Sequence, residues 1–253
     1  MKTNTLKKAL SRHEMTYGCW VTLAHPLIPE ILSQAGFDWL TIDMEHSSIE
    51  LGDLLPLIIS TEANGMVPLV RVGENNPNLI KRVMDAGAYG VIVPNVNSAG
   101  EAQRAVDSVK YPPYGKRGVG LYRAQRYGRE FEAYKKWLAK ESVVIIQIEH
   151  IDAVRDIDNI FAVEGIDAFV VGPYDLSGSL GCPGEFDRPV VKQAIARYER
   201  VCKKMRKPMG FHVVQPEPKR VMALKKKGYA FLAVGIDTLY LGIKARDTLK
   251  ESC

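Results

Sequence analysis

The sequence contains no run of about 18 uncharged apolar residues, the length that a membrane-spanning helix requires. Its first ten residues, Met1–Leu10, lack the apolar segment of a secretory signal. Its four cysteines show no spacing typical of metal ligands. We therefore expect a cytoplasmic protein with reduced thiols and no membrane partner.

An excess of charge of one sign is also nearly absent, since the formal net charge is only +5. The densest basic run, Lys225–Lys227, precedes Gly228, which is typical of a solvated helix end where cations favour the helix dipole. No aromatic residues are interleaved with these lysines, so we expect small-molecule partners rather than nucleic acid.

Short apolar runs alternate with segments of helical periodicity along the chain. We predict eight strands: Gly18–Leu23, Trp39–Asp43, Val67–Val72, Gly90–Pro94, Val143–Ile148, Ala168–Gly172, Met209–Val213 and Phe231–Val234. The clearest helical segments are Leu51–Ala63, Asn78–Ala86, Val190–Met205 and Glu217–Lys227. Glycines fit the positions that end helices before the next strand: Gly36, Gly65, Gly87, Gly165 and Gly228.

The strands are mostly continuous apolar runs, which indicates burial on both faces and hence a parallel sheet. Eight such units in 253 residues predict a single-domain α/β protein, a (β/α)8 TIM barrel spanning residues 1–253. A doubly wound open sheet is the alternative. Polar residues at the carboxyl ends of several different strands favour the barrel.

Two acidic residues follow consecutive predicted strands. Glu149 closes the run Val143–Ile148, and Asp175 lies just past Ala168–Gly172. Neighbouring parallel strands run about 4.8 Å apart, so side chains at their ends can share one cation. We interpret Glu149 and Asp175 as ligands of Mg²⁺ or Mn²⁺, with Co²⁺ a further candidate. Two ligands leave room for a chelating 2-oxo acid, whose enolate the metal would stabilise.

The second and third predicted strands end in a further polar group. Asp43 and His46 are candidates for a general base in which the aspartate orients the imidazole. The alternative is a structural hydrogen bond between them. Arg71 ends an apolar strand, and its planar fork suits a carboxylate or an enolate oxygen. An ion pair with Asp43 or Glu45 is the structural alternative for Arg71, and both roles are compatible.

Other polar residues of predicted strand ends and helix ends are weaker candidates. Gln147 shares a face with Glu149 and is expected to orient a bound oxo group, or else to form a hydrogen bond within the barrel. His212 is expected to contact substrate or to be a satisfied core histidine. Asp85 is expected to end a helix or to reach towards His46. A helix starting near Tyr174 would offer free N–H groups to a substrate carboxylate.

A long connection joins the fourth and fifth predicted strands. It contains Lys116 and Arg117 among three glycines, followed by Arg123, Arg126 and Arg129. Long connections of this kind are commonly functional. Lys116 and Arg117 with the three glycines are candidates for an anion contact.

Several short motifs resemble those of the HpcH/HpaI family of class II, metal-dependent 2-oxo-acid aldolases. They are Gly36-Phe37-Asp38-Trp39, Asp43-Met44-Glu45-His46, Val70-Arg71-Val72, Asp85-Ala86-Gly87-Ala88, Tyr111-Pro112-Pro113, Arg117-Gly118-Val119-Gly120, Gln147-Ile148-Glu149 and Gly172-Pro173-Tyr174-Asp175-Leu176-Ser177. The resemblance extends over about residues 18–247. It implies an enzyme that reversibly cleaves a 4-hydroxy-2-oxo acid or a 2-dehydro-3-deoxy sugar acid into pyruvate and an aldehyde.

The resemblance also implies a TIM barrel assembled as a homo-hexamer, a trimer of dimers with exchanged C-terminal helices. It implies Glu149 and Asp175 as metal ligands and Gln147 as an orienting amide. Arg71 would steady the enolate oxygen, and His46 with Asp43 would form the base, assisted by Asp85. Backbone N–H groups of Tyr174 and Asp175 would hold the pyruvate carboxylate.

Three departures from the family pattern fall where the aldehyde is expected to lie. Tyr174 replaces a residue that is usually small, His212 replaces one that is commonly aliphatic, and the run Leu121–Arg126 is atypical. Citrate-lyase-like or citrate-synthase-like chemistry, oxaloacetate decarboxylation, or a catalytically idle barrel that binds a sugar acid are therefore alternatives. A Schiff-base aldolase is disfavoured, since none of the predicted strands contains a lysine.

Overall fold

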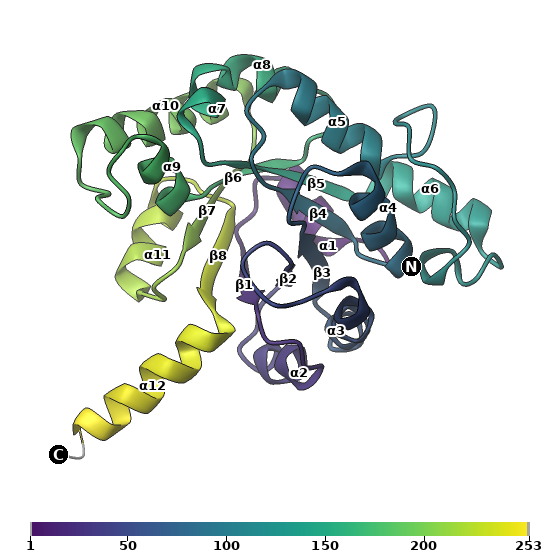
Figure 1. Cartoon of the computed structure of the whole chain (residues 1–253), viewed down its shortest axis with the longest axis horizontal. Coiled ribbons are helices and arrows are strands. Elements are labelled where there is room, and N and C mark those ends of the chain that lie inside the picture. The colour runs from purple at the N-terminus through teal and green to yellow at the C-terminus, as the bar shows by residue number, and fades with distance from the viewer. Residues whose placement is uncertain (1, 252–253) are drawn as a thin grey trace.

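The computed structural model, which describes residues 2–251, is a closed barrel of eight parallel strands that neighbour one another in chain order (Figure 1). The strands are β1 (Thr16–Val21), β2 (Trp39–Asp43), β3 (Val67–Arg71), β4 (Gly90–Val93), β5 (Val143–Ile148), β6 (Ala168–Val171), β7 (Met209–Val213) and β8 (Phe231–Ile236). Pairing of β1 with β8 closes the barrel, which rules out the open sheet. The predicted extension of the domain to Met1 and to Ser252–Cys253 concerns residues outside the described range.

The barrel strands are buried almost throughout because helices cover their outer faces and side chains fill the interior. The predicted bounds of β2, β5 and β7 are confirmed, and the other strands differ only at their ends. β1 begins at Thr16 rather than Gly18, because Thr16 and Tyr17 pair with the start of β8.

Helices alternate with the strands around the barrel (Figure 1). They are α1 (Thr5–Ser11), α2 (Leu27–Ser33), α3 (Leu51–Ala63), α4 (Pro77–Ala86), α5 (Ala99–Val109), the 3-10 helix η1 (Arg123–Gln125), α6 (Phe131–Glu141), α7 (Ile151–Arg155), α8 (Ile157–Ala162), α9 (Pro173–Ser179), α10 (Pro189–Met205), α11 (Pro218–Lys226) and α12 (Asp237–Glu251). All five glycines expected at helix ends have a positive φ, as the prediction required. Among the described helices, none combines the length and the hydropathy needed to cross a bilayer.

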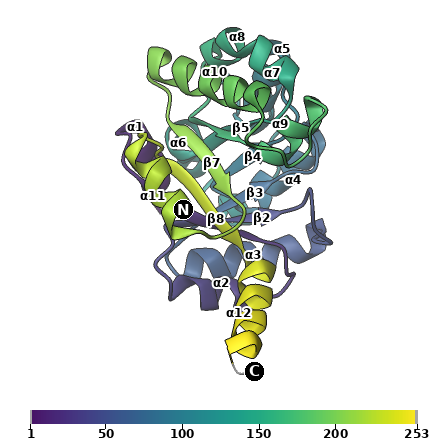
Figure 2. The same cartoon turned by 90° about the vertical axis from the view of Figure 1, so that its left-hand side faces the viewer.

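The two ends of the barrel differ in what covers them. At the amino-terminal end, α1 packs Leu6 and Leu10 into the core, and Lys7 pairs with Asp167 just before β6. At the other end lie the polar residues that follow the strands. The C-terminal helix α12 leaves the barrel and points away from it, as both views show (Figures 1 and 2).

Candidate active site

Asp43 and Arg71 end the neighbouring strands β2 and β3 and lie opposite each other in the register. The Arg71 guanidinium donates through Nε to Oδ1 of Asp43 (2.9 Å) and through a terminal nitrogen to Oδ2 (2.6 Å). Both side chains are almost fully buried, so the pair is a bidentate, charge-assisted ion pair that is shielded from water. The structural ion pair predicted for Arg71 is confirmed, and a role in catalysis stays compatible with it.

Glu45 is a second partner of Arg71. Its Oε2 lies 3.0 Å from the other terminal nitrogen of Arg71, but without the alignment of a hydrogen bond. Burial raises the pKa of Glu45 to about 7; the charge of Arg71 opposes this shift, and those of Glu149, Asp43 and Asp175 add to it. Glu45 therefore shares one electrostatic environment with the two acids proposed as metal ligands.

The expected hydrogen bond between the Asp43 carboxylate and the His46 imidazole is not formed. Asp43 instead accepts the backbone N–H groups of Glu45 (3.0 Å) and His46 (3.3 Å), while the fork of Arg71 occupies both carboxylate oxygens. The His46 side chain is 61% exposed, and its Nε2 lies 3.9 Å from Oε2 of Glu45. Glu45, which the sequence offered only as a partner of Arg71, is therefore the carboxylate closest to this imidazole in the described contacts.

Glu149 directly follows β5 and is buried among hydrogen-bond donors. Its Oε1 accepts the backbone N–H of Asn95 (2.6 Å), and its Oε2 accepts the side-chain amide of Gln147. Burial raises the pKa of Glu149, the two donors lower it, and the negative charge of Asp175 raises it further. Gln147 and Glu149 are thus joined on one face, as the prediction placed them, and Asp175 is close enough to affect Glu149.

Asp175 lies in the first turn of α9, immediately after β6, and β6 pairs with β5 in the barrel. Gly172 between them leaves room for the site, because a Cβ there would lie 2.9 Å from Oε2 of Glu149 and 3.3 Å from the Gln147 amide nitrogen. Asp175 is exposed, in contrast to Glu149. The two acids therefore meet at one rim of the barrel, with one carboxylate fixed and the other facing solvent.

This donor set fits a hard divalent cation. Carboxylate oxygens are the ligands that Mg²⁺ and Mn²⁺ prefer, and a cation here would offset the mutual repulsion of Glu149 and Asp175. Within residues 2–251, no group of three or more His, Cys, Asp and Glu side chains is arranged to hold a metal. A cation at this rim would therefore keep coordination positions for water and substrate oxygens.

Asp85 lies on α4 and faces the insertion after β4. Its Oδ1 accepts from the guanidinium of Arg117 (3.3 Å) and from the Gln125 side chain (3.5 Å), and burial raises its pKa while Arg117 lowers it. The Arg117 side chain is fully buried and also donates to the Tyr134 hydroxyl (2.8 Å). Arg117, one of the two basic residues expected to gather an anion, is therefore paired with Asp85 within the chain. Within residues 2–251, the hydrogen-bond partners of the Asp85 side chain belong to the insertion and do not include His46.

His212 projects from β7 into the barrel, where its ring stacks on Trp20 of β1 at 4.6 Å. The Arg71 guanidinium lies 5.4 Å from the centre of the Trp20 ring. Burial lowers the pKa of His212 to about 4, and the charge of Arg71 lowers it further, so the imidazole is neutral at pH 7. Its Nε2 is buried without a hydrogen-bond partner among the described residues. His212 is therefore not a fully satisfied core histidine.

The sequence reasoning missed several residues that shape this site. Trp20 links His212 to Arg71, Asn95 donates its backbone N–H to Glu149, and Gly172 provides the space for both Glu149 and Gln147. Asn95 and Gly172 directly follow the ends of strands in the sequence, which was the available signal. No local pattern indicated that Trp20 faces inward.

The sequence matches the family described as HpcH/HpaI aldolase/citrate lyase over residues 16–242. A 5-keto-4-deoxy-D-glucarate aldolase of Salmonella paratyphi A is 37% identical over 235 residues, which cover 92% of this chain and 91% of the relative. The crystal structure of a family protein from Burkholderia cenocepacia J2315 is 32% identical, with a TM-score of 0.93 over 99% of both chains.

A solved citrate synthase, SbnG, is 28% identical, with a TM-score of 0.87 over 98% of this chain and 96% of its own. The barrel, the polar residues at its carboxyl end and the match over most of the sequence therefore agree with the family that the motifs indicated. The chain belongs to the HpcH/HpaI aldolase/citrate lyase family and is an enzyme of the aldolase type, a carbon–carbon lyase.

Proposed function

We propose that the enzyme reversibly cleaves a keto-deoxy sugar acid into pyruvate and an aldehyde, with Mg²⁺ or Mn²⁺ held by Glu149 and Asp175. The observation that carries this proposal is the meeting of these two acids at the ends of β5 and β6, where the negative charge of Asp175 disfavours the ionised form of Glu149. The name of the relatives, 5-keto-4-deoxy-D-glucarate aldolase, supports a sugar acid as substrate.

The divalent ion would act as a Lewis acid on the ketone oxygen of pyruvate. The chain's own residues would position the substrate. Gln147 is fixed beside Glu149 and orients the oxo group, and the N–H groups of Tyr174 and Asp175 in the first turn of α9 bind the carboxylate. Arg71 is held by Asp43 and contacts Glu45, and its guanidinium places a positive charge near the enolate oxygen.

A proton must leave C3 of pyruvate before its electron pair can form a bond to the aldehyde carbon, and the aldehyde oxygen must gain a proton. His46 is the proposed base, with Glu45 3.9 Å from its Nε2 as the neighbouring carboxylate. Asp43 supports the base only indirectly, through the backbone of His46 and the side chain of Arg71. Asp85 is the proposed assisting acid, although its hydrogen-bond partners among residues 2–251 lie on the insertion and do not include His46.

The test is exchange of deuterium into the pyruvate methyl group, which needs no aldehyde. Exchange should appear with Mn²⁺ or Mg²⁺, disappear in chelator, and fall at least about 1,000-fold in Glu149→Ala and Asp175→Ala. Asp152→Ala removes an exposed carboxylate after β5 and is the matched control. Full exchange in chelator would refute the metal site, and metal binding without exchange would favour an idle, sugar-acid-binding barrel.

Citrate-synthase-like or citrate-lyase-like chemistry is a second candidate, favoured by the similarity to the solved citrate synthase. Product analysis separates these reactions. Incubation of pyruvate with a panel of aldehydes should give new hydroxy-oxo acids, whereas oxaloacetate alone should not be consumed faster than in buffer with metal. Consumption of oxaloacetate without aldehyde products would favour decarboxylation instead.

We further propose a homo-hexamer, a trimer of dimers, in which partners exchange α12. The helix projects from the barrel (Figure 2). Its Leu241 and Leu249 are exposed, which supports contact with another subunit. Light scattering should give the hexamer mass, and Leu241→Asp with Leu249→Asp should lower it. A cytoplasmic location is proposed as well, since Cys19, Cys182 and Cys202 are buried free thiols.

A further inference from the structure

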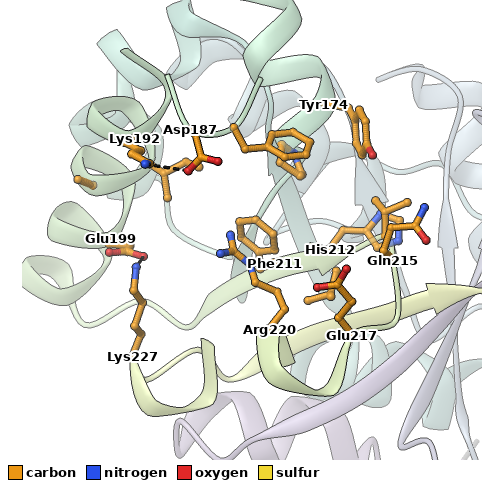
Figure 3. Close-up of a pocket in the computed structure, with 16 residues that line it drawn as sticks. Tyr174, Asp187, Lys192, Glu199, Phe211, His212, Gln215, Glu217, Arg220 and Lys227 are labelled. Carbon is orange, nitrogen blue, oxygen red and sulfur yellow. Dashed lines mark hydrogen bonds and ion pairs between the residues drawn. The ribbon is translucent and has the colours of Figure 1, made fainter. Parts of the chain in front are cut away.

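Trp20 of β1 contacts two polar side chains that come from distant strands. Its ring centre is 4.6 Å from that of His212 on β7, and the Arg71 guanidinium carbon, from β3, lies 5.4 Å from it. Because β8 and β2 separate these strands in the sheet, the three side chains can meet only inside the barrel. Phe211, the residue before His212, points to the other face of β7 and contacts Arg220 (Figure 3).

The Arg71 guanidinium needs a contact other than Asp43 to fix its orientation. The two hydrogen bonds to Asp43 are parallel and hold the guanidinium within its own plane. They leave it free to tilt about the line that joins the two donors, and the contact with Glu45 lacks the alignment of a hydrogen bond. The face of the Trp20 indole attracts the cation and limits this tilt.

The Trp20 ring is in turn held by His212. The indole is 1% exposed, and its Nε1 has no hydrogen-bond partner among residues 2–251, so packing alone orients it. The His212 imidazole stacks on it with the two planes 22° apart, and a hydrogen bond with the backbone of Gly235 anchors the imidazole. An aliphatic side chain could not form that hydrogen bond and would not offer a flat surface to the indole.

We infer that Trp20 and His212 are positioning residues for the reaction. Trp20 keeps the Arg71 guanidinium from tilting, and His212 keeps the Trp20 ring in place. Their task rests on the proposed function, in which Arg71 faces the enolate oxygen. It requires no contact between His212 and the substrate, which agrees with the burial of its Nε2.

The test measures deuterium exchange into pyruvate at saturating Mn²⁺ and pyruvate. Trp20→Leu should lower the rate about 10- to 100-fold, and His212→Ala about 3- to 10-fold, because a displaced guanidinium stabilises the enolate less. His212→Phe keeps a flat ring and should restore the rate to within about threefold of the wild type. The dissociation constant for Mn²⁺ should change less than about twofold in all three variants. Phe231→Leu, which removes a buried ring that stacks on Trp39 at 4.0 Å, is the matched control and should leave exchange within about threefold.

A repeat of Trp20→Leu in an Arg71→Lys background separates positioning from a general loss of structure. A lysine offers no planar group to orient, so Trp20→Leu should then cost less than about threefold. Losses that simply multiply in the double variant, or His212→Phe as slow as His212→Ala, would overturn the inference.

A second measurement needs no activity and decides the inference if the wild-type enzyme itself fails to exchange, in which case the proposed function fails. The Nε–H of Arg71 donates to Asp43, and ¹⁵N NMR can follow its exchange with solvent, with Arg71→Lys assigning the signal. Trp20→Leu and His212→Ala should each speed this exchange at least about fivefold, and Phe231→Leu should not. An unchanged rate in Trp20→Leu would refute the positioning role.

Discussion

The two walls of the barrel mouth contrast in how their charges are compensated. On the β2–β3 side, Asp43 and Arg71 form a closed pair in which both carboxylate oxygens have donors. On the β5–β6 side, the negative charge of Asp175 raises the pKa of Glu149 in addition to burial, and the hydrogen-bond donors of Glu149 are neutral amides. The β2–β3 wall contains its own cation, Arg71, whereas the β5–β6 wall has only neutral donors, and for this wall we propose a bound metal ion.

The two walls therefore suit different tasks: the β2–β3 wall can position a fixed charge, and the β5–β6 wall can bind a cation. A paired, buried guanidinium keeps its geometry without ligand, so Arg71 can present a fixed charge to a developing oxyanion. Two adjacent carboxylates without a cation are electrostatically unfavourable, and binding of a metal relieves that repulsion. Burial raises the pKa of Glu45, Arg71 lowers it, and Glu149, Asp43 and Asp175 raise it, so charges of both walls affect this one group.

The largest effect on stability is expected from breaking the pair of Asp43 and Arg71 on the β2–β3 wall. Arg71→Ala leaves Asp43 buried without a counter-charge and should lower the free energy of unfolding by about 3–5 kcal/mol in urea titrations. Arg155→Ala, which removes an exposed pair with Asp152 (2.8 Å), should change it by less than about 1 kcal/mol.

Arg71→Lys keeps a charge but loses the fork, and it should fold while its turnover falls more than its metal affinity. If Arg71→Lys instead loses metal binding in step with stability, Arg71 is only structural. If the Arg71→Ala variant is as stable as the wild type, the buried ion pair between Asp43 and Arg71 is not formed in solution.

A smaller effect is expected from titration of the groups between the walls, measured in chelator. The folded pKa of Glu45, about 7, exceeds the ordinary value of 4.5, so the folded state binds more protons and stability falls as pH rises from 4.5 to 7. His212 has the opposite sign, because its folded pKa of about 4 lies below 6.5 and stability falls as pH drops from 6.5 to 4. Each contributes at most about 3 kcal/mol, and the two slopes largely cancel.

The single variants should therefore expose opposite slopes. Urea titrations between pH 4.5 and 6.5 should show stability rising more steeply with pH in Glu45→Gln than in the wild type. In His212→Asn, the same measurement should show stability falling as pH rises. Parallel profiles for all three proteins would mean that neither group is perturbed as its burial indicates.

The β5–β6 wall can be altered without substituting Glu149 or Asp175. Gly172→Ala places a Cβ 2.9 Å from Oε2 of Glu149, at a φ of −92° that alanine adopts without strain. The carboxylate and the Gln147 amide must shift, and pyruvate exchange should fall about 10- to 100-fold with a change in unfolding free energy below about 2 kcal/mol. Gly178→Ala in α9, where nothing lies within 4 Å, is the control and should leave exchange unchanged. Equal exchange in both variants would place the catalytic acids elsewhere.

The architecture was accessible from the sequence because buried parallel strands appear as continuous apolar runs. The run Val143–Ile148 matches β5 from end to end, and the glycine after α4 has the positive φ expected of a helix terminator. Strand ends were less certain where pairing decides them, as for Thr16 in β1. Helix starts were displaced where a proline occupies the first turn, as Pro77 and Pro189 do.

The site was predictable only as far as strand order determines it. Consecutive parallel strands bring their carboxyl ends together, so the closeness of Arg71 to Asp43 followed from the sequence. The spacing of two residues in one strand placed Gln147 and Glu149 on one face. Which acid an arginine selects depends on three-dimensional geometry. For that reason the sequence missed the pairing of Arg117 with Asp85 and the position of Glu45 beside the His46 imidazole.

The smallest effect is expected at Tyr174, on the acceptor side of the β5–β6 wall. Its ring is 46% exposed and packs edge-on against Phe186, so Tyr174→Ala should change the unfolding free energy by only about 1 kcal/mol. Pyruvate exchange should stay within about twofold, since the backbone N–H of residue 174 is retained. The KM for bulky aldehydes should fall about 3- to 10-fold because space opens beside the aldehyde carbon. Tyr114→Ala, equally an exposed tyrosine but on the insertion, should leave both quantities unchanged. A large rise in pyruvate exchange in Tyr174→Ala, without any aldehyde, would contradict this prediction. It would show that the Tyr174 ring obstructs the proposed metal site and not the binding of the aldehyde.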